Sequence, residues 1–333
     1  MVYGSSVAIA LRDFSDPYHF VRDQLRWLVF GGAAFVIFAN ISYRHWFKAA
    51  LPILLFTLIL LLAVFIPGIG VRALGAQRWL NFQLFVVQPA ELAKLALVIY
   101  LAAWFSFPEK GRLAPFLLLL AMVVGLVIAE PDLGTAVVII ATAVVLYFLS
   151  GAPISHLLVL VPLLAAGVAI LAVISPYRLS RLATFLNPES DPLGSSYQIR
   201  QVLLGLGSGG LWGVGIGKSR QKFEYLPEAN TDSIFAIIGE EVGFGGAVLL
   251  ILLFLLLVWR GFRIGSVAPD QFGRLLALGI SSWIGIQTTV NLAANVALVP
   301  LTGIPLPLIS YGGSSLIVIL AALGIVANIS RAR

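Results

Sequence analysis

The sequence predicts an all-α fold, a polytopic membrane helical bundle, on three observations. Of the 333 residues, 60% are hydrophobic and only 11% are charged, which is too little charge for the surface of a soluble domain of this length. Apolar runs long enough to cross about 30 Å of hydrocarbon recur along the whole chain. The alternating pattern that is typical of membrane β-barrel strands does not occur.

The apolar runs give the elements in chain order, as about nine visible transmembrane helices. They cover residues 25–42, 47–66, 89–107, 113–129, 133–150, 154–175, 234–258, 272–299 and 314–329. The first residues, MVYGSSVAIALRDF, resemble the end of another helix, and they lack the basic region and cleavage site of a signal peptide. We therefore expect a single integral membrane domain over residues 1–333.

The Lys and Arg residues of the short loops predict the orientation, because cytoplasmic loops carry the excess of positive charge. The side with more of them holds Arg44, Lys48, Lys110, Arg112, Arg260, Arg263, Arg274, Arg331 and Arg333. The opposite side holds Arg12, Arg22, Arg26, Arg72 and Arg78. Residues 176–233 then form a long extracytoplasmic loop, in which YQIRQVLLGLG has the apolar spacing of a helix lying on the membrane surface.

Composition also excludes some classes of site and partner. There is no cysteine, hence no disulfide, no thiolate metal site and no cysteine nucleophile. The net charge of +6 comes from residues scattered over loops, so it indicates membrane topology and phosphate-bearing lipids rather than nucleic acid. The three histidines are scattered too, and we predict no metal site formed by the protein's own side chains.

Asp232 lies at the outer end of an apolar helix, in LPEANTDSIFAIIGEE. It could be an N-cap that accepts hydrogen bonds from free backbone N–H groups. It could instead be a general base whose pKa is raised by partial burial, although the helix dipole opposes that rise. The sequence leaves both readings open.

Glu91 and Lys94 lie three residues apart in the apolar segment QPAELAK, where they share one helix face. Ionisable groups inside a membrane span are functional candidates, and a structural ion pair is the alternative. Glu130 and Asp132, in EPDLGTA, lie between two helices and favour a turn with capping acids over a cation site, since two ligands are too few.

Basic residues of the outer loop suit a phosphate or diphosphate group, with contact to anionic lipid as the alternative. The segment TGIPLPLISYGGSS re-enters the membrane, where irregular backbone must line a cavity or be buried in protein. The candidate substrate-binding residues are Arg78, Gln88, Glu91, Lys94, Arg178, Lys218, Arg220 and Ser310.

Eight segments in register resemble the SEDS family (shape, elongation, division, sporulation), of the FtsW and RodA type. They are GAQRW, QPAELAK, EPDLGTA, NPESDPLGSSYQ, GSGG, LPEANTD, IGEEVG and GIPLPLISYGGSS, and they span residues 75–315. The segment GVGIGKSRQKFEYLPEA is more similar to the FtsW branch. Family members commonly read HTDFIFA where this chain has Asn230 and Ser233, so the fit of the substrate around the aspartate is open.

The resemblance implies a ten-helix peptidoglycan glycosyltransferase, of which the first helix is truncated or missing here. It implies polymerisation of lipid II at the outer face of the bacterial cytoplasmic membrane, with Asp232 as catalytic base and inversion at the sugar. A class B penicillin-binding protein and other division or elongation membrane proteins are the implied partners. A divalent cation, Mg or Mn, is the expected cofactor, with no organic cofactor. The alternatives are a lipid II flippase and a non-catalytic scaffold.

Overall fold

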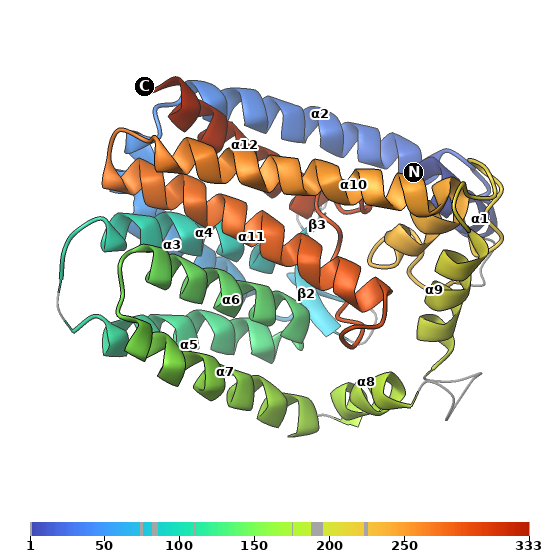
Figure 1. Cartoon of the computed structure of the whole chain (residues 1–333), viewed down its shortest axis with the longest axis horizontal. Helices are drawn as coiled ribbons and strands as arrows, with labels where there is room; N and C mark the ends of the chain where they lie inside the picture. Colours follow the sequence, from blue (N-terminus) through green and yellow to red (C-terminus); the bar gives the residue numbers. More distant parts are fainter. Residues whose placement is uncertain are drawn as a thin grey trace. The chain divides into compact units, whose positions relative to one another are not determined.

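A computed structural model describes residues 2–73, 76–81, 86–109, 111–174, 176–187, 196–222 and 226–332. Figure 1 shows the elements that these residues form. In chain order they are α1 (Val2–Phe14), α2 (His19–Asn40), α3 (Arg44–Ala63), β1 (Gly70–Ala73), β2 (Ala76–Asn81), β3 (Val86–Val87), α4 (Pro89–Phe105), α5 (Leu113–Ala129), α6 (Leu133–Leu149), α7 (Ile154–Ile174), α8 (Pro176–Leu186), α9 (Tyr197–Ser208), α10 (Ile234–Ser266), α11 (Gln271–Asn295) and α12 (Gly313–Arg331).

The predicted apolar spans are confirmed as helices, since each falls on one of α2–α7 or α10–α12. Among the described residues, α3, α7, α10, α11 and α12 are long and apolar enough to cross a membrane. Two further apolar helices, α5 and α6, are 17 residues long. The segment predicted to form a surface helix is helical as α9, with Ile199 and Val202 buried and Leu203 exposed.

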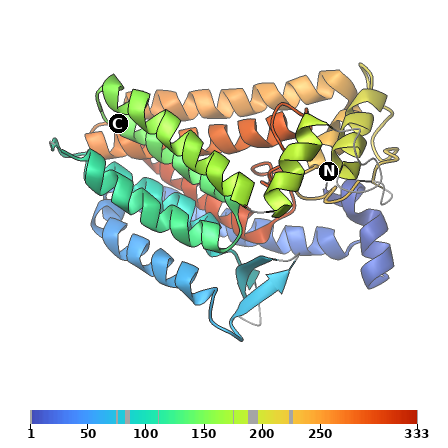
Figure 2. The same cartoon turned by 90° about the horizontal axis from the view of Figure 1, so that it is seen from below.

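A small antiparallel sheet, with strand order β1-β2-β3, follows the end of α3 and was not predicted from the sequence (Figure 2). Its strands contain four, six and two residues, too few for an alternating pattern to stand out. The sheet carries Arg78 on β2.

Contacts within the chain divide it into two compact units, which we describe separately. The first unit contains residues 1–27, 166–256 and 287–312, and the second contains residues 28–165, 257–286 and 313–333. The predicted single integral domain over residues 1–333 stays a prediction.

In the second unit, α4 is the central helix. It begins with Pro89, whose missing N–H costs nothing at a first helical position. Nearly all of its side chains are buried, and it packs against α3, α6 and α12. The helix α6 packs against both α4 and α5 (Figure 1). A helix that is buried on every side must neutralise any charge that it carries within the protein.

In the first unit, α9 packs on the first turns of α10 through an apolar cluster. Val202 of α9 contacts the cluster formed by Leu226, Ala236 and Ile237, all of them buried. Since Asp232 lies two residues before α10 begins, this packing fixes the backbone around it.

The helix α10 is broken at Gly243, where φ is 68° and ψ is −172°. A helix break leaves backbone N–H and C=O groups without helical partners. Here the loop of residues 209–215 supplies those partners. The bonds run from Val214 N to Glu240 O (2.9 Å), Gly215 N to Glu241 O (3.0 Å), Phe244 N to Gly210 O (2.9 Å) and Gly245 N to Leu211 O (3.1 Å).

Side chains also hold the outer loop to α10. The Glu240 carboxylate accepts hydrogen bonds from the Ser219 hydroxyl and from the backbone N–H of Arg220 (2.9 Å). The neighbouring Glu241 accepts one from Lys222 Nζ at 3.4 Å, in a buried ion pair. The two acids inside this apolar helix therefore hold the outer loop, and both are paired there.

Replacing Gly213 by Ala should destabilise the first unit. Gly213 has φ of +81°, and an added Cβ would lie 2.2 Å from the carbonyl oxygen of Glu241. Strained backbone of this kind costs about 1–3 kcal/mol, so we expect a lower midpoint of thermal unfolding in lipid nanodiscs.

The matched control is Gly207→Ala in α9. An added Cβ at Gly207 has no neighbour within 4 Å, and Ala favours a helix over Gly. Its midpoint should stay level or rise. Equal midpoints for the two variants would contradict the attachment of the 209–215 loop to α10.

Candidate functional site

Asp232 is buried just outside α10, which begins at Ile234. Its carboxylate accepts a hydrogen bond from Ser233 Oγ at 3.4 Å. Among the described residues, no backbone N–H of the first turn of α10 donates to the carboxylate. The geometry therefore favours the second reading of Asp232, a carboxylate available for chemistry, over the N-cap.

Two amides of α11 hold the backbone of Asp232. Asn291 Nδ2 and Asn295 Nδ2 each donate to the main-chain oxygen of Asp232 at 2.9 Å. Asn291 also donates to the main-chain oxygen of Ile304 at 2.8 Å. The amides thus fix the position of the residue through its backbone and do not bond to its carboxylate.

A charged pair of opposite signs flanks the carboxylate. Arg181 of α8 donates from Nη1 to the main-chain oxygen of Leu301 at 2.7 Å. A Cβ built on Gly303 would lie 4.0 Å from both Arg181 Nη1 and Asp232 Oδ2, so the two groups share the space beside this glycine. Glu228 accepts a hydrogen bond from Thr231 Oγ1 at 2.7 Å through Oε2.

These surroundings raise the pKa of Asp232 to about 7. Burial is the largest cause, and the negative charge of Glu228 raises the pKa further. The positive charge of Arg181 lowers it in part. Near neutral pH this carboxyl group therefore exists in both protonation states, as a group that takes up and releases protons must.

Ser310, a predicted substrate-binding residue, forms hydrogen bonds to backbone groups in this structure. Its hydroxyl donates to the main-chain oxygen of Thr231 and accepts from Leu306 N at 2.8 Å. Tyr311 N donates to the main-chain oxygen of Asn230 at 2.8 Å. Ser310 is thus a positioning residue that ties the 301–311 segment to the loop carrying Asp232.

The predicted loop cations are not brought to Asp232 by contacts of the described residues. Lys218 and Arg220 are exposed on the loop that follows α9. The side chain of Arg178 lies outside the described residues. Arg181, which the sequence offered only as one basic residue of the loop, is the cation beside the carboxylate. Arg178 and Arg181 are three residues apart in α8, a spacing that predicts two basic residues on one helix face and could have drawn attention to this helix.

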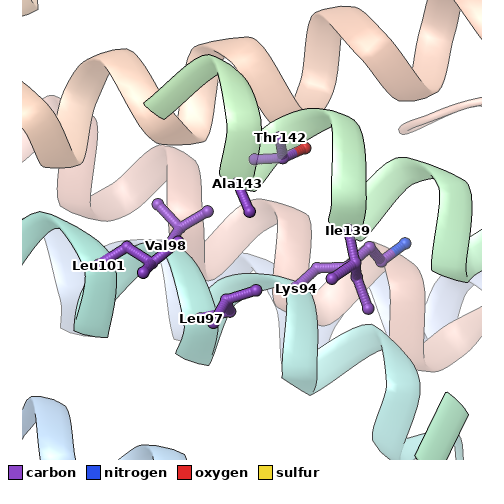
Figure 3. A pocket seen from close by; sticks show the side chains of 7 residues that line it. All are labelled: Lys94, Leu97, Val98, Leu101, Ile139, Thr142 and Ala143. Atoms are coloured by element: carbon purple, nitrogen blue, oxygen red, sulfur yellow. The ribbon is translucent and has the colours of Figure 1, made fainter. Parts of the chain in front are cut away.

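In the second unit, Glu91 and Lys94 form a buried ion pair. Lys94 Nζ lies 2.7 Å from Glu91 Oε1 and 5.4 Å from the centre of the Trp283 ring. Lys94 also borders a small void of about 10 Å³, shown with its lining in Figure 3, in which Thr142 is the other polar residue. The two charges neutralise each other within the central helix α4, which agrees with the structural ion pair that the sequence offered as an alternative.

Gln88 and Asp132, at the starts of α4 and α6, lie together in the second unit. Asp132 caps α6 by accepting from the backbone N–H (3.0 Å) and the hydroxyl (2.9 Å) of Thr135. Gln88 Nε2 donates to Asp132 at 3.3 Å. This confirms the interpretation of EPDLGTA as a turn with a capping acid, with Asp132 rather than Glu130 as the cap.

Glu130 is buried in the same turn, and neither carboxylate oxygen has a hydrogen-bond partner among the described residues. Arg78 donates from Nε to the main-chain oxygen of Glu130 at 3.1 Å and from Nη2 to that of Pro131. Burial, with the charge of Asp132, raises the pKa of Glu130 to about 8 despite the opposing charge of Arg78. Arg78, predicted to bind substrate, thus braces a turn.

The described residues contain no group of three or more His, Asp or Glu side chains placed to hold a metal ion. Of the described acids in the first unit, Glu228 contacts Thr231 and Glu240 contacts the outer loop. The donor set that a divalent cation prefers, six or more oxygens including carboxylates, does not come from these side chains alone.

A sequence model of the family described as cell cycle protein (FtsW, RodA and SpoVE) matches residues 1–333. The chain is 42% identical to stage V sporulation protein E of Bacillus subtilis, over 99% of this chain and 92% of that protein. It is also 42% identical to the probable peptidoglycan glycosyltransferase FtsW of Geobacter metallireducens, over 99% of this chain and 90% of that protein.

Solved structures agree with this similarity. One similar chain comes from a peptidoglycan synthase complex described as coordinating polymerization and crosslinking, with a TM-score of 0.80 and 32% identity over 99% of this chain and 94% of that chain. Another is the rod shape determining protein RodA of Thermus thermophilus, with a TM-score of 0.71 and 32% identity over 99% and 93% of the two chains.

Glu130→Gln should change how stability depends on pH. Because the folded state raises the pKa of Glu130 from 4.5 to about 8, it binds that proton more tightly than the unfolded chain does. This contribution is present below pH 4.5 and is lost as pH rises through 8, by about 1.4 kcal/mol for each unit of pKa difference. Glutamine mimics the protonated acid, so the variant should lose less stability across this window.

The measurement is the thermal unfolding midpoint in lipid nanodiscs from about pH 5 to about pH 9. Glu109→Gln, which removes an exposed carboxylate of the same unit, is the control and should follow wild type. A Glu130→Gln curve parallel to that of wild type would show that Glu130 is ionised in the folded protein.

Proposed function

Because this chain belongs to the FtsW, RodA and SpoVE family of cell cycle proteins, we propose that it polymerises lipid II with Asp232 as general base. It is a multi-pass membrane protein and a peptidoglycan glycosyltransferase. Among the alternatives that the sequence left open, the enzyme is the one that agrees with the names of these relatives, ahead of a flippase or a scaffold.

The observation that carries the proposal is the state of the Asp232 carboxyl group. It is buried, its pKa is about 7, and its oxygens are not used to cap α10. A general base works best when its pKa lies near the operating pH, because it is then both deprotonated and able to accept a proton.

In the proposed reaction, the Asp232 carboxylate accepts the proton of the 4-hydroxyl of the acceptor sugar. That oxygen attacks the anomeric carbon of the donor, and the bond from this carbon to the lipid diphosphate breaks. The diphosphate leaves with the electron pair. A donor that is α-linked gives a β-linked strand, so a single displacement with inversion needs no covalent enzyme intermediate, and Asp232 alone suffices as base.

Arg181 is the cation best placed to offset charge during this step. Its charge acts on Asp232, and its guanidinium is held by the main-chain oxygen of Leu301 on the segment that also contains Gly303. A guanidinium in that position suits the phosphate oxygens of a leaving diphosphate. The Mg or Mn ion stays a prediction, and no step of the proposed reaction depends on it. Activity measured in EDTA, with either ion added back, tests whether the enzyme requires a divalent cation.

We further propose the setting in which the enzyme works. The excess of Lys and Arg on one side of the chain supports an orientation in the bacterial cytoplasmic membrane that puts Asp232 on the extracytoplasmic side. The similarity to a chain of a peptidoglycan synthase complex supports a partner, for which a class B penicillin-binding protein is our candidate. Other division or elongation proteins of the membrane complete the predicted assembly.

Asp232→Asn should abolish polymerisation while the protein stays folded. Asparagine has the same shape but cannot accept the proton, and loss of a general base costs about 100-fold or more in rate. The assay follows glycan strands made from fluorescent lipid II by purified protein with a class B partner that has no polymerase activity. Glu109→Gln, an exposed carboxylate of the other unit, is the control.

Equal strand formation by wild type and Asp232→Asn would place the base elsewhere in the chain. If folded wild-type protein with a matched partner made no strands, transport of the lipid-linked precursor would become the better function.

Glu228→Gln should move the acidic limb of the pH–rate profile to lower pH. Glu228 raises the pKa of Asp232 by like charge, so its removal lets Asp232 ionise at lower pH. The rate in the wild type should rise through about pH 7 as Asp232 loses its proton. The profile of kcat/KM, measured from about pH 5.5 to about pH 8.5 for both proteins, checks the direction of the shift. A limb that stays in place would assign it to another group.

A further inference from the structure

We propose that residues 210–217, together with Phe244 beside them, form a membrane wedge. In this wedge apolar side chains lie among the acyl chains of the bilayer, while the flanking Lys218 and Arg220 bind the phosphate groups of anionic phospholipids. The proposal concerns how the outer loop is anchored and does not depend on the reaction that the protein catalyses.

The wedge exposes large apolar side chains where a surface loop would carry polar ones. The exposed fractions are 67% for Leu211, 88% for Trp212, 78% for Ile216 and 64% for Phe244. Phe244 lies beside the loop because its backbone N–H donates to the main-chain oxygen of Gly210. Exposed apolar side chains gathered on one segment mark a surface that contacts a membrane or a protein.

The backbone of the wedge is suited to an environment without water. Non-helical backbone enters a bilayer only when its polar groups are bonded within the protein, since each unsatisfied group is costly there. The backbone N–H groups of Gly213, Val214 and Gly215 donate to main-chain oxygens of Gly209, Glu240 and Glu241. The apolar tip is therefore attached to α10 by bonds that lipid does not compete for.

The charge of this stretch suits the phosphate groups of anionic phospholipid. No Asp or Glu occurs from Ser196 to Lys222, whereas four basic residues do. Of these, Lys218 and Arg220 follow the apolar tip directly and are exposed. Long basic side chains at the edge of an apolar surface reach the phosphates of anionic lipid while their stems stay in the apolar layer.

The wedge is also continuous with a surface that lipid is expected to cover. After Phe244, α10 presents Leu249 and Leu252 on its exposed side, within a helix long and apolar enough to cross the membrane. Tryptophan is enriched where such surfaces meet the headgroup layer, which matches Trp212. The bilayer is thus the occupant that explains the apolar tip, its bonded backbone and its flanking cations together.

The natural absence of cysteine permits a direct test by single substitutions. In lipid nanodiscs without partner protein, Ile216→Cys should react with a membrane-impermeant maleimide as slowly as Leu252→Cys. Ser266→Cys, exposed at the end of α10, should react fast. A fluorophore attached to the Ile216→Cys variant should lose more emission with brominated acyl chains than one attached to the Ser266→Cys variant. Reaction of Ile216→Cys as fast as Ser266→Cys, or protection that appears only with the partner protein, would overturn the proposal.

A separate measurement tests whether Lys218 and Arg220 bind the headgroups of anionic phospholipids. Wild-type protein should unfold at a higher temperature in phosphatidylglycerol nanodiscs than in phosphatidylcholine nanodiscs. The double variant Lys218→Gln with Arg220→Gln should lose part of that gain, and Arg263→Gln, an exposed arginine elsewhere, should keep it. A gain that the double variant retains in full would remove the two cations from the proposal.

Discussion

The candidate site depends on one backbone carbonyl, the main-chain oxygen of Asp232. Two side-chain amides, from Asn291 and Asn295, converge on it, and Ser310 holds the preceding carbonyl of Thr231. Bonds to backbone fix where the carboxylate stands without occupying its lone pairs. A catalytic group needs this combination, because a carboxylate that is tied by strong hydrogen bonds is a weaker base.

The break in α10 also places backbone groups where a distant part of the chain can bond to them. A continuous helix would bond its backbone internally and offer nothing to the outer loop. The break at Gly243 frees backbone N–H and C=O groups of α10, and residues 209–215 form hydrogen bonds to them. The Glu240 carboxylate accepts a further hydrogen bond from the backbone N–H of Arg220, which follows in the same loop. Residues 209–215, a glycine-rich part of the predicted outer loop, are thus bonded to the helix that begins beside Asp232.

Sequence reasoning predicted what local pattern encodes and missed what distant contacts decide. Apolar runs located the helices, and the spacing of Glu91 and Lys94 placed them on one helix face, where they form the ion pair that was one of the two alternatives. The meeting of Arg181 with Leu301, 120 residues away, leaves no local pattern, and neither does the bond from Ser310 to Thr231. Asp232 was singled out by its place at the outer end of an apolar helix, and the resemblance then implied the role of base. The hydrogen bonds and charges that bear on cap against base come from distant parts of the chain.

The ion pair of α4 also bears on how this helix enters the bilayer during synthesis. An ionised residue in an inserting helix costs up to roughly 2.5–3.5 kcal/mol, the value at the helix centre, and Glu91 and Lys94 lie in the first two turns of α4. Glu91 and Lys94 are one turn apart on the same helix, and their bond needs no other element. The pair can therefore form as soon as the helix coils, before α3, α6 or α12 is beside it. The segment that ends as the most enclosed helix of its unit brings its own counter-charge to the translocon.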